Sequence, residues 1–251
     1  MREVVYGRRP VREVLRAGRR QVLELLASER ALTAEPWLSD FPGLRVQVVR
    51  EGRLTEVAGS PDHQGVVALC EPYRYADAFE LAAGERPLVV CLDQITDPQN
   101  LGAVARSAEG AGASGLVLPE RNAARVTPAV CRASAGAVEH LHVGVVVNLA
   151  RYLEGIKRGD LWIWAADLGA RTTVWEADLA GGAALVFGAE GRGLRPGVRR
   201  ACDDAFTIPL AGAVESLNVS VAAGVALFEA ARQRRGSAQS PPVPGTTPRN
   251  G

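Results

Sequence analysis

The first segment able to do chemistry joins a predicted strand to a predicted helix and carries an amide and a guanidinium. It reads LDQITDPQNLGAVAR over residues 92–106. Asp97 is a favourable N-cap and Pro98 a favourable first helical residue, so a helix should begin here. Asn100 then lies in the first turn, where free backbone N–H groups attract anions, and Arg106 lies about 120° around the helix from it. The two share a site only if Arg106 reaches sideways, and capping plus one exposed arginine is the simpler alternative.

A second segment carries glycines directly after a predicted buried strand. Residues 183–194 contain Gly188, Gly191 and Gly193, and such a loop lets backbone N–H groups approach a ligand closely. A phosphate-binding loop would have lysine, serine or threonine after the glycines, whereas this loop contains Glu190. The carboxylate indicates a ligand that is not polyanionic, such as an amino-acid or sulfonium group.

The third segment, residues 208–221, runs from a short predicted strand through a glycine-containing turn into a long helix. Ser216 is the expected N-cap, and the helix is predicted over 217–231 with Asn218 as the polar residue of its first turn. This helix is apolar nearly all round, which predicts burial in the core or against another subunit. Ser216 has no G-x-S-x-G context and no obvious histidine base, so it is a poor nucleophile candidate.

One glycine pattern points elsewhere. Residues 110–115 read Gly-Ala-Gly-Ala-Ser-Gly and match the G-x-G-x-x-G dinucleotide fingerprint. That fingerprint must follow a strand and open a helix. Here it follows a predicted helix and opens a predicted strand, so it indicates a helix C-terminus and a turn. A nucleotide-dependent dehydrogenase therefore loses its best support.

Apolar runs alternate with helical patterns from residue 88 onward and place the three segments at strand ends. Several runs are nearly continuous Val, Leu and Ile, as in parallel strands buried on both faces. The predicted strands are 88–92, 115–118, 141–147, 161–165, 183–187 and 205–208. They predict an α/β domain with a mostly parallel sheet over residues 87–235.

The rest of the chain divides into a small N-terminal unit, a linker and a tail. Residues 1–71 indicate an α/β unit, with a first helix near Pro10. Its other predicted elements are strands at 22–27, 44–49 and 65–70 and a helix over 31–38. Residues 72–86 contain proline, glycine and several charges, which is typical of a linker. The Pro-, Ser-, Gly- and Thr-rich segment 236–251 is predicted to be disordered.

Charge is distributed unevenly along the 251 residues. The net charge is only +1, and 28 of the 29 basic residues are arginine. Within residues 1–20, however, seven arginines against two glutamates give +5. This patch, which includes Arg8, Arg9 and Arg12, is typical of surfaces that bind phosphate backbones; a solvated helix face is the alternative.

The composition also predicts the compartment. No run reaches the roughly 18 apolar residues of a membrane span, and the first residues lack the apolar core of a signal peptide. The four cysteines have irregular spacings that indicate neither a disulfide framework nor a zinc cluster. We expect a cytoplasmic protein that needs no metal.

Taken together, the three segments closely resemble the signature motifs of the SpoU/TrmH-type RNA 2′-O-ribose methyltransferases of the SPOUT superfamily. The matching stretches are DPQNLGAVARSAEGAG, VFGAEGRGL and IPLAGAVESLNVSVAAGVALFEA, in this order. Val5-Tyr6-Gly7 and the stretch HQGVVA at 63–68 are similar to the L30e-like substrate-binding domain of the bacterial 23S rRNA guanosine 2′-O-methyltransferases. The resemblance covers nearly the whole chain except the tail.

The resemblance implies a fold, a reaction and a set of site residues. The C-terminal α/β domain should contain a trefoil knot, and the protein should be a homodimer. The implied reaction moves a methyl group from S-adenosylmethionine to a ribose 2′-hydroxyl of RNA, here of a guanosine in 23S rRNA. The implied catalytic residues are Asn100, Arg106, Glu190, Ser216 and Asn218. The implied cofactor contacts, largely through backbone atoms, are Gly188, Ile208 and Leu217.

Other functions stay open at this point. A tRNA ribose methyltransferase, an rRNA methyltransferase that confers antibiotic resistance, and a non-catalytic RNA-binding relative would share much of this sequence. The N-terminal domain favours rRNA, and the presence of all five polar site residues favours catalysis. Because arginine side chains stay protonated in proteins, we expect Arg106 to activate the hydroxyl electrostatically through the neighbouring phosphate rather than as a base.

Overall fold

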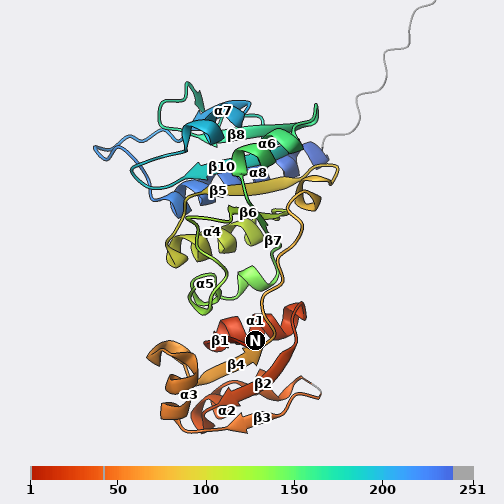
Figure 1. The fold of residues 1–251 in the computed structure, drawn as a ribbon, viewed down its shortest axis with the longest axis vertical. Helices are drawn as coiled ribbons and strands as arrows, with labels where there is room; N and C mark the ends of the chain where they lie inside the picture. Colours follow the sequence, from red (N-terminus) through yellow and green to blue (C-terminus); the bar gives the residue numbers. More distant parts are fainter. Residues whose placement is uncertain (1, 42, 240–251) are drawn as a thin grey trace, which may run out of the picture.

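Residues 2–41 and 43–239 are described by the computed structural model, which forms two α/β domains placed end to end (Figure 1). The N-terminal domain has a four-stranded sheet of order β1-β4-β2-β3, in which β2 and β3 are parallel and the other pairs antiparallel. Its strands are β1 (Glu3–Tyr6), β2 (Val22–Ala27), β3 (Val46–Val48) and β4 (Val66–Cys70). The predicted strands correspond to β2, β3 and β4.

The helices of this domain differ more from the prediction. They are α1 (Arg8–Ala17), α2 (Glu29–Ala34) and α3 (Glu51–Ala58). The helix predicted over 31–38 is divided, because Pro36 has no N–H to continue α2 and begins a separate 3₁₀ turn, η1 (Pro36–Ser39). Helix α3 is not among the predicted elements, since the helix is short and its apolar face has only three residues, the buried Leu54 with Val57 and Ala58.

The C-terminal domain is built on a seven-stranded sheet of order β7-β6-β5-β10-β8-β11-β9, with every pair parallel. Its strands are β5 (Leu88–Asp93), β6 (Gly115–Pro119), β7 (Val143–Val146), β8 (Leu161–Ala166), β9 (Thr172–Thr173), β10 (Gly182–Gly188) and β11 (Asp204–Thr207). The apolar runs predict all of these except the two-residue β9. The expected α/β fold with a mostly parallel sheet is confirmed.

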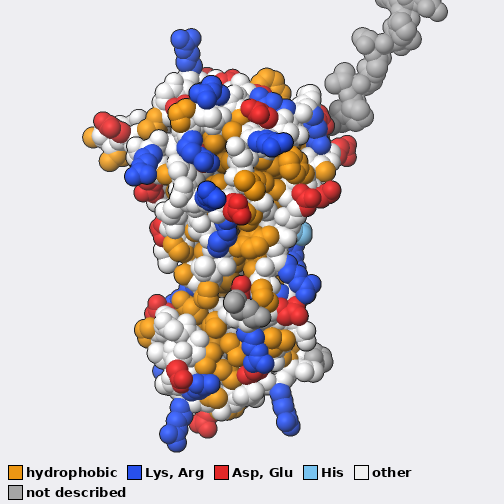
Figure 2. Space-filling model, in the orientation of Figure 1, with side chains coloured by type: hydrophobic (Ala, Val, Ile, Leu, Met, Phe, Trp, Pro, Cys, Tyr) orange, Lys and Arg blue, Asp and Glu red, His pale blue; other side chains and the backbone are white. Residues whose placement is uncertain are grey.

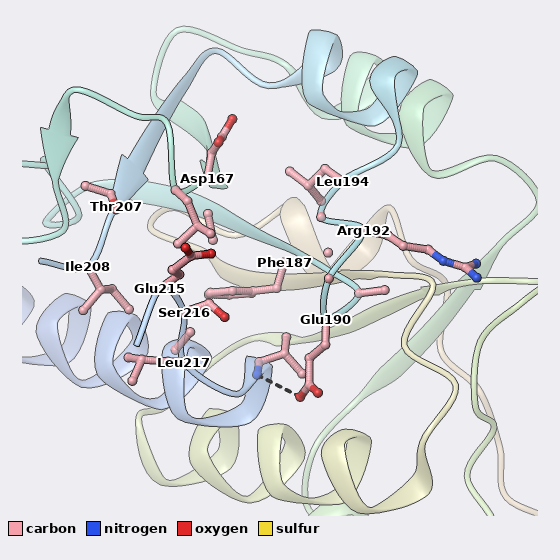
Figure 3. Close-up of a pocket in the computed structure, with 18 of the residues that line it drawn as sticks. Asp167, Phe187, Glu190, Arg192, Leu194, Thr207, Ile208, Glu215, Ser216 and Leu217 are labelled. Carbon is pink, nitrogen blue, oxygen red and sulfur yellow. Dashed lines mark hydrogen bonds between the residues drawn. The ribbon is translucent and has the colours of Figure 1, made fainter. Parts of the chain in front are cut away.

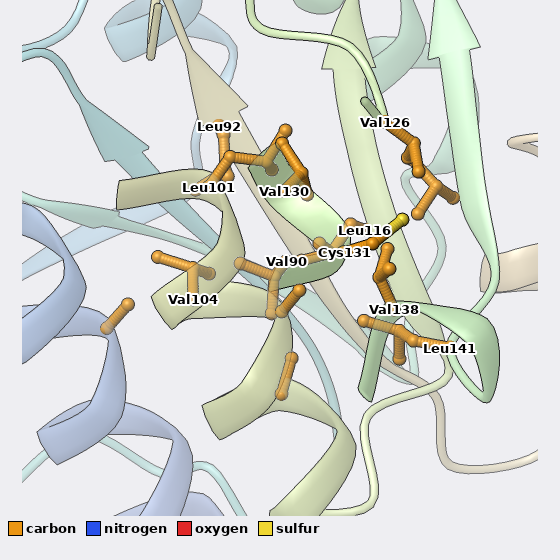
Figure 4. Close-up of a cluster of buried hydrophobic side chains, with 14 of the residues drawn as sticks. Val90, Leu92, Leu101, Val104, Leu116, Val126, Val130, Cys131, Val138 and Leu141 are labelled. Atoms are coloured by element: carbon orange, nitrogen blue, oxygen red, sulfur yellow. The ribbon is translucent and has the colours of Figure 1, made fainter. Parts of the chain in front are cut away.

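Helices cover both faces of this sheet. They are α4 (Pro98–Gly110), α5 (Pro128–Ala133), α6 (Leu149–Ile156), α7 (Pro196–Ala201) and α8 (Val219–Gln239), with 3₁₀ turns η2 (Pro61–His63), η3 (Glu80–Ala82) and η4 (Ala137–Glu139) elsewhere. Along β5, Val90 and Leu92 join the cluster with α4, α5 and α8, whereas Val89 and Cys91 join the cluster with α6 and α7. Figure 4 shows part of the first cluster, with Leu101 of α4 beside Leu92.

The glycine pattern at 110–115 has the structure that its context predicts. Helix α4 ends at Gly110, and Gly112 follows with φ of 76° in the turn. Strand β6 then begins at Gly115. The pattern is a helix end and a turn, not a dinucleotide loop.

The segment 72–86 packs along the C-terminal domain. The Tyr73 hydroxyl donates to the carbonyl oxygen of Leu141 at 3.0 Å. Ala76 forms a parallel bridge beside β7 and donates its N–H to the carbonyl of Val143 at 2.9 Å. The predicted linker is therefore held in place, by partners that lie far along the chain.

A buried ion pair joins the two domains. Arg20, only 4% exposed, donates to both carboxylate oxygens of Glu139, only 1% exposed. Arg20 also lies 2.9 Å from Glu3, and Glu13 lies 2.8 Å from His140 across the same junction. Burial alone would lower the pKa of Arg20, but the hydrogen bond and charge of Glu139 raise it above its usual value, so Arg20 stays positively charged. The molecule narrows at this junction (Figure 2), and these contacts fix one domain against the other.

Helix α8 begins at Val219 and continues through 236–239, the first residues of the predicted disordered tail. The remainder of that tail, 240–251, lies outside the described residues. One face of α8 is buried, through Ala223, Ala226, Leu227 and Ala230. Val221 and Phe228 are instead 50% and 54% exposed. Burial in the core is thus correct for one face, and a subunit contact stays a prediction for the other.

The four cysteines are free and buried. Burial raises the pKa of Cys70 and of Cys202 to about 12, so both thiols stay protonated and pack as small apolar groups. Among the described residues, no helix has the length and apolar character that crossing a membrane requires.

Candidate active site

A cavity of about 540 Å³ opens at the carboxyl ends of β8, β10 and β11 (Figure 3). In an open parallel sheet, this edge is where ligands bind. The loop after β10 and the segment before α8 form much of its wall. All three expected cofactor contacts, Gly188, Ile208 and Leu217, line this cavity, and so does Ser216. We call it the methyl-transfer cavity, after the reaction that the sequence resemblance implies.

The loop after β10 is held closed by backbone contacts and one half-buried ion pair. A Cβ on Gly188 would stand 2.2 Å from the carbonyl carbon of Gly193, so only glycine lets the loop fold back on the strand end. Gly193 donates its N–H to Ala189 at 2.8 Å. Asp93, fully buried at the end of β5, accepts from the backbone N–H of Arg195 at 2.9 Å and from its Nε at 2.8 Å. Sequence reasoning missed this pair, although a carboxylate ending an apolar strand was a signal for it.

Three of the expected catalytic side chains meet beside the methyl-transfer cavity. Asn218 donates its Nδ2 to Asn100 Oδ1 at 3.0 Å and to Glu190 Oε1 at 2.5 Å. Asn100 Nδ2 lies 3.4 Å from the same Glu190 oxygen. These residues come from α4, from the loop after β10 and from the start of α8, and we call them the amide–carboxylate cluster. Glu190 and Asn218 are exposed and Asn100 is half-buried, so a polar group of a substrate can reach the cluster.

The amide–carboxylate cluster also supports the start of α8. The Val219 N–H donates to Glu190 at 3.4 Å, and Figure 3 shows Glu190 pointing to this first turn. The Ser220 N–H donates to Asn218 Oδ1 at 2.9 Å, so Asn218 is the N-cap. The expected cap at Ser216 is wrong, because the helix begins three residues after Ser216 and asparagine caps equally well.

The remaining predicted site residues lie outside the amide–carboxylate cluster. Arg106 is exposed on α4, and no ion pair or hydrogen bond joins it to another described side chain. The same holds for the exposed Ser216. Arg8 is already engaged, since its Nη1 lies 3.0 Å from Glu35 and its Nε donates to the Gln64 carbonyl.

The charged groups around the methyl-transfer cavity carry more negative than positive charge. The carboxylates are Asp167, Glu190 and Glu215, and the guanidiniums are Arg192 and Arg199. A hydrogen bond from Arg199 Nε at 2.9 Å, and then a backbone N–H, hold the pKa of Asp167 below its usual range. Within 2–41 and 43–239, no group of three or more His, Cys, Asp or Glu residues is placed to hold a metal ion. The charge balance suits a cationic or zwitterionic ligand.

Known families match both domains. Residues 87–228 match the SpoU rRNA Methylase family, and residues 4–76 match the family described as RNA 2′-O ribose methyltransferase substrate binding. The chain is 37% identical over 244 residues to the 23S rRNA (guanosine-2′-O-)-methyltransferase RlmB of Pectobacterium atrosepticum, covering 94% of this chain and 100% of that one.

Two further relatives bear on the site. An uncharacterized tRNA/rRNA methyltransferase of Synechocystis, slr0955, is 43% identical over 76% of this chain, which spans about half (51%) of that relative. The crystal structure of the SpoU methyltransferase AviRb from Streptomyces viridochromogenes, in complex with the cofactor AdoMet, matches with a TM-score of 0.80 and 28% identity, over 94% of this chain and 91% of that one. With its methylase and substrate-binding domains in this arrangement, the chain belongs to the SpoU family of RNA 2′-O-ribose methyltransferases.

Proposed function

We propose that this protein methylates the ribose 2′-hydroxyl of a guanosine in 23S rRNA, with S-adenosylmethionine as the methyl donor. The observation that carries the proposal is the amide–carboxylate cluster of Asn100, Glu190 and Asn218 beside the methyl-transfer cavity. The choice of 23S rRNA is supported by the RlmB relative, which aligns over its whole length, and by the substrate-binding match at 4–76.

The methyl-transfer cavity fits the cofactor in size and chemistry. Its volume of about 540 Å³ lies within the range of small-molecule sites. Phe187, Ile208 and Leu217 offer apolar contact for a flat base, while Glu190 and Glu215 favour a positively charged ligand. When bound, S-adenosylmethionine supplies the methyl group.

Each residue of the site then has a role that its position permits. Gly188, Ile208 and Leu217 hold the cofactor through backbone atoms, and Ser216 adds a hydroxyl to the same wall. The amide–carboxylate cluster binds and orients the ribose hydroxyl, whose alignment with the methyl group lowers the barrier. Arg106 binds the adjacent phosphate and stabilises the negative charge that develops on the hydroxyl oxygen as the hydroxyl proton passes to solvent water.

We further propose the assembly and setting of the enzyme. Two chains associate through the outward face of α8, where the half-exposed Val221 and Phe228 form an apolar surface. The C-terminal domain is knotted as the family resemblance implies, and the protein works in the cytoplasm. Sedimentation of the purified chain tests the dimer, because Phe228→Glu should convert it to monomers.

The function is tested with tritiated S-adenosylmethionine and RNA from a strain that lacks the gene. We expect label in 23S rRNA, at one guanosine when 2′-O-methyl positions are mapped. Label in tRNA instead would show that the substrate is tRNA and not 23S rRNA. No transfer to any RNA, together with no heat of cofactor binding, would identify a non-catalytic RNA-binding protein.

A further inference from the structure

A second cavity, of about 450 Å³, lies where α1 of the N-terminal domain meets α5 of the C-terminal domain. We call it the junction cleft. The charged residues that line it are Arg8, Arg9, Arg12, Arg132 and Glu35. Four guanidiniums therefore face one carboxylate, the reverse of the charge balance at the methyl-transfer cavity.

Of the seven arginines in the basic N-terminal segment, four are neutralised by carboxylates and three are not. Arg2, Arg8, Arg16 and Arg20 each form an ion pair with a carboxylate. Arg9, Arg12 and Arg19 are exposed and pair with no carboxylate in the described part of the chain. Arg9 and Arg12 are three residues apart on α1, so both point to the same side of that helix, and both line the junction cleft. Arg19 does not line it.

The C-terminal domain adds the remaining cation. The guanidinium carbon of Arg132 lies 6.0 Å from the ring centroid of Tyr6, and Nη1 would be 3.0 Å from a Cβ on Gly7. Arg132 is thus held against β1, with no carboxylate partner among residues 2–41 and 43–239. Helix α5, which carries Arg132, also packs closely against α4, which carries Asn100 of the active site. A Cβ on Gly102 of α4 would stand only 2.4 Å from the Cβ of Ala133.

We propose that the junction cleft is a second RNA-binding site, which holds a backbone phosphate of the substrate strand through Arg9, Arg12 and Arg132. This rests on the proposed function in requiring an RNA substrate. Guanidinium groups bind phosphate oxygens through paired hydrogen bonds, and an unneutralised group of three is stabilised by a polyanion. Arg132 is the positioning residue, because it belongs to the domain that carries the methyl-transfer cavity and contacts the domain that binds RNA.

The buried pair of Arg20 and Glu139 prepares the cleft before RNA arrives. It fixes the two domains and therefore the separation of Arg132 from Arg9 and Arg12. The helices that carry the three arginines are therefore already in position when the phosphate binds, so no entropy is lost in ordering the two domains.

The test is filter binding of a 23S rRNA transcript at several KCl concentrations, with Arg132→Gln, Arg132→Lys and the double variant Arg9→Gln/Arg12→Gln. Arg19→Gln is the matched control for Arg9 and Arg12, because it removes an exposed and unpaired charge from the same domain but outside the junction cleft. We expect Arg132→Gln to weaken binding about tenfold and to reduce the slope of log K against log salt by about 0.7–1. Arg132→Lys should keep the slope but not the full affinity. Arg19→Gln should change neither.

Methylation kinetics on the same transcript separate this site from the methyl-transfer cavity. Arg132→Gln should raise KM for RNA and leave kcat and cofactor binding unchanged. A salt slope for Arg132→Gln equal to that of the wild type, or an equal loss in Arg19→Gln, would overturn the proposal. If the wild type binds RNA with this dependence on Arg132 but transfers no methyl group, the proposed function fails and the junction cleft stands.

Discussion

The methyl-transfer cavity and the junction cleft are close in volume but opposite in charge. The first is enclosed by loops at strand ends and carries three carboxylates against two guanidiniums. The second lies between helices α1 and α5 of the two domains and carries four guanidiniums against one carboxylate. A near-zero net charge thus conceals two cavities of opposite charge, for which we propose a sulfonium ligand and a backbone phosphate.

The largest expected effect is on stability, when the buried ion pair of Arg20 and Glu139 between the two domains is broken. Glu139→Gln leaves Arg20 buried beside only the partly exposed Glu3, so we expect the free energy of unfolding to fall by about 3–5 kcal/mol. Urea denaturation measures this. Glu24→Gln, which breaks the exposed pair with Arg2, should cost no more than about 1 kcal/mol. Equal losses in the two variants would mean that the buried pair is not what joins the domains.

The amide–carboxylate cluster is tested by Asn100→Ala. The substitution removes the oxygen that accepts from Asn218, and we expect kcat to fall about 100-fold because the hydroxyl is no longer aligned. Calorimetry should show unchanged cofactor affinity. Gln99→Ala, one position earlier on the same exposed turn, should keep full turnover. If Asn100→Ala does too, Asn100 has no part in the reaction.

A smaller effect on the methylation rate shows whether Arg106 acts through its positive charge alone or through the paired donors of its guanidinium. Arg106→Lys keeps the positive charge but loses the paired donors of the guanidinium, so we expect single-turnover methylation to slow about tenfold. The control is Arg53→Lys on exposed α3, with no change in rate. A methylation rate near that of the wild type in Arg106→Lys would show that a point charge is sufficient.

The smallest effect concerns acid stability at the rim of the methyl-transfer cavity. Since the hydrogen bond from Arg199 lowers the pKa of Asp167, the ionised pair stabilises the fold above the ordinary pKa of aspartate, and this stabilisation is lost as pH falls through the lowered pKa. In Arg199→Gln the pKa of Asp167 should rise toward its ordinary value, so acid unfolding should begin at a slightly higher pH. Carbon NMR of the Asp167 carboxyl reports the pKa directly. Arg200→Gln, at the exposed neighbouring position, should not move it; an equal shift there would exclude the hydrogen bond as the cause.

Much of the C-terminal fold follows from sequence because buried parallel strands are continuous apolar runs. Strands β5 and β10 are predicted to within one residue at each end. Helix α3 and the packing of segment 72–86 are not predicted. The apolar face of α3 is only three residues long, so its periodic signal is weak. Segment 72–86 depends on distant partners such as Val143, which leave no local signal at all.

Within the site, too, some contacts can be predicted from the sequence and others cannot. Asn100, Glu190 and Asn218 could be expected together because their segments follow strands whose carboxyl ends share an edge. The pairing of Asp93 with Arg195 could not, since it depends on how the loop after β10 folds back. The engagement of Arg8 by Glu35 is likewise invisible in sequence, where all the arginines of the basic patch look equivalent.

The packing of segment 72–86 has a consequence for how a substrate is chosen. Because Tyr73 and Ala76 are hydrogen-bonded to the C-terminal domain, the distance between the two binding sites is a constant of the molecule rather than the length of a tether. Ribose hydroxyls are chemically alike along an RNA, so a fixed distance between the two sites selects a hydroxyl by its position rather than by its chemistry. If both proposed sites act on one substrate, we expect methylation where the folded RNA sets one hydroxyl at that span from the bound phosphate, and none at the same nucleotides in an unfolded strand.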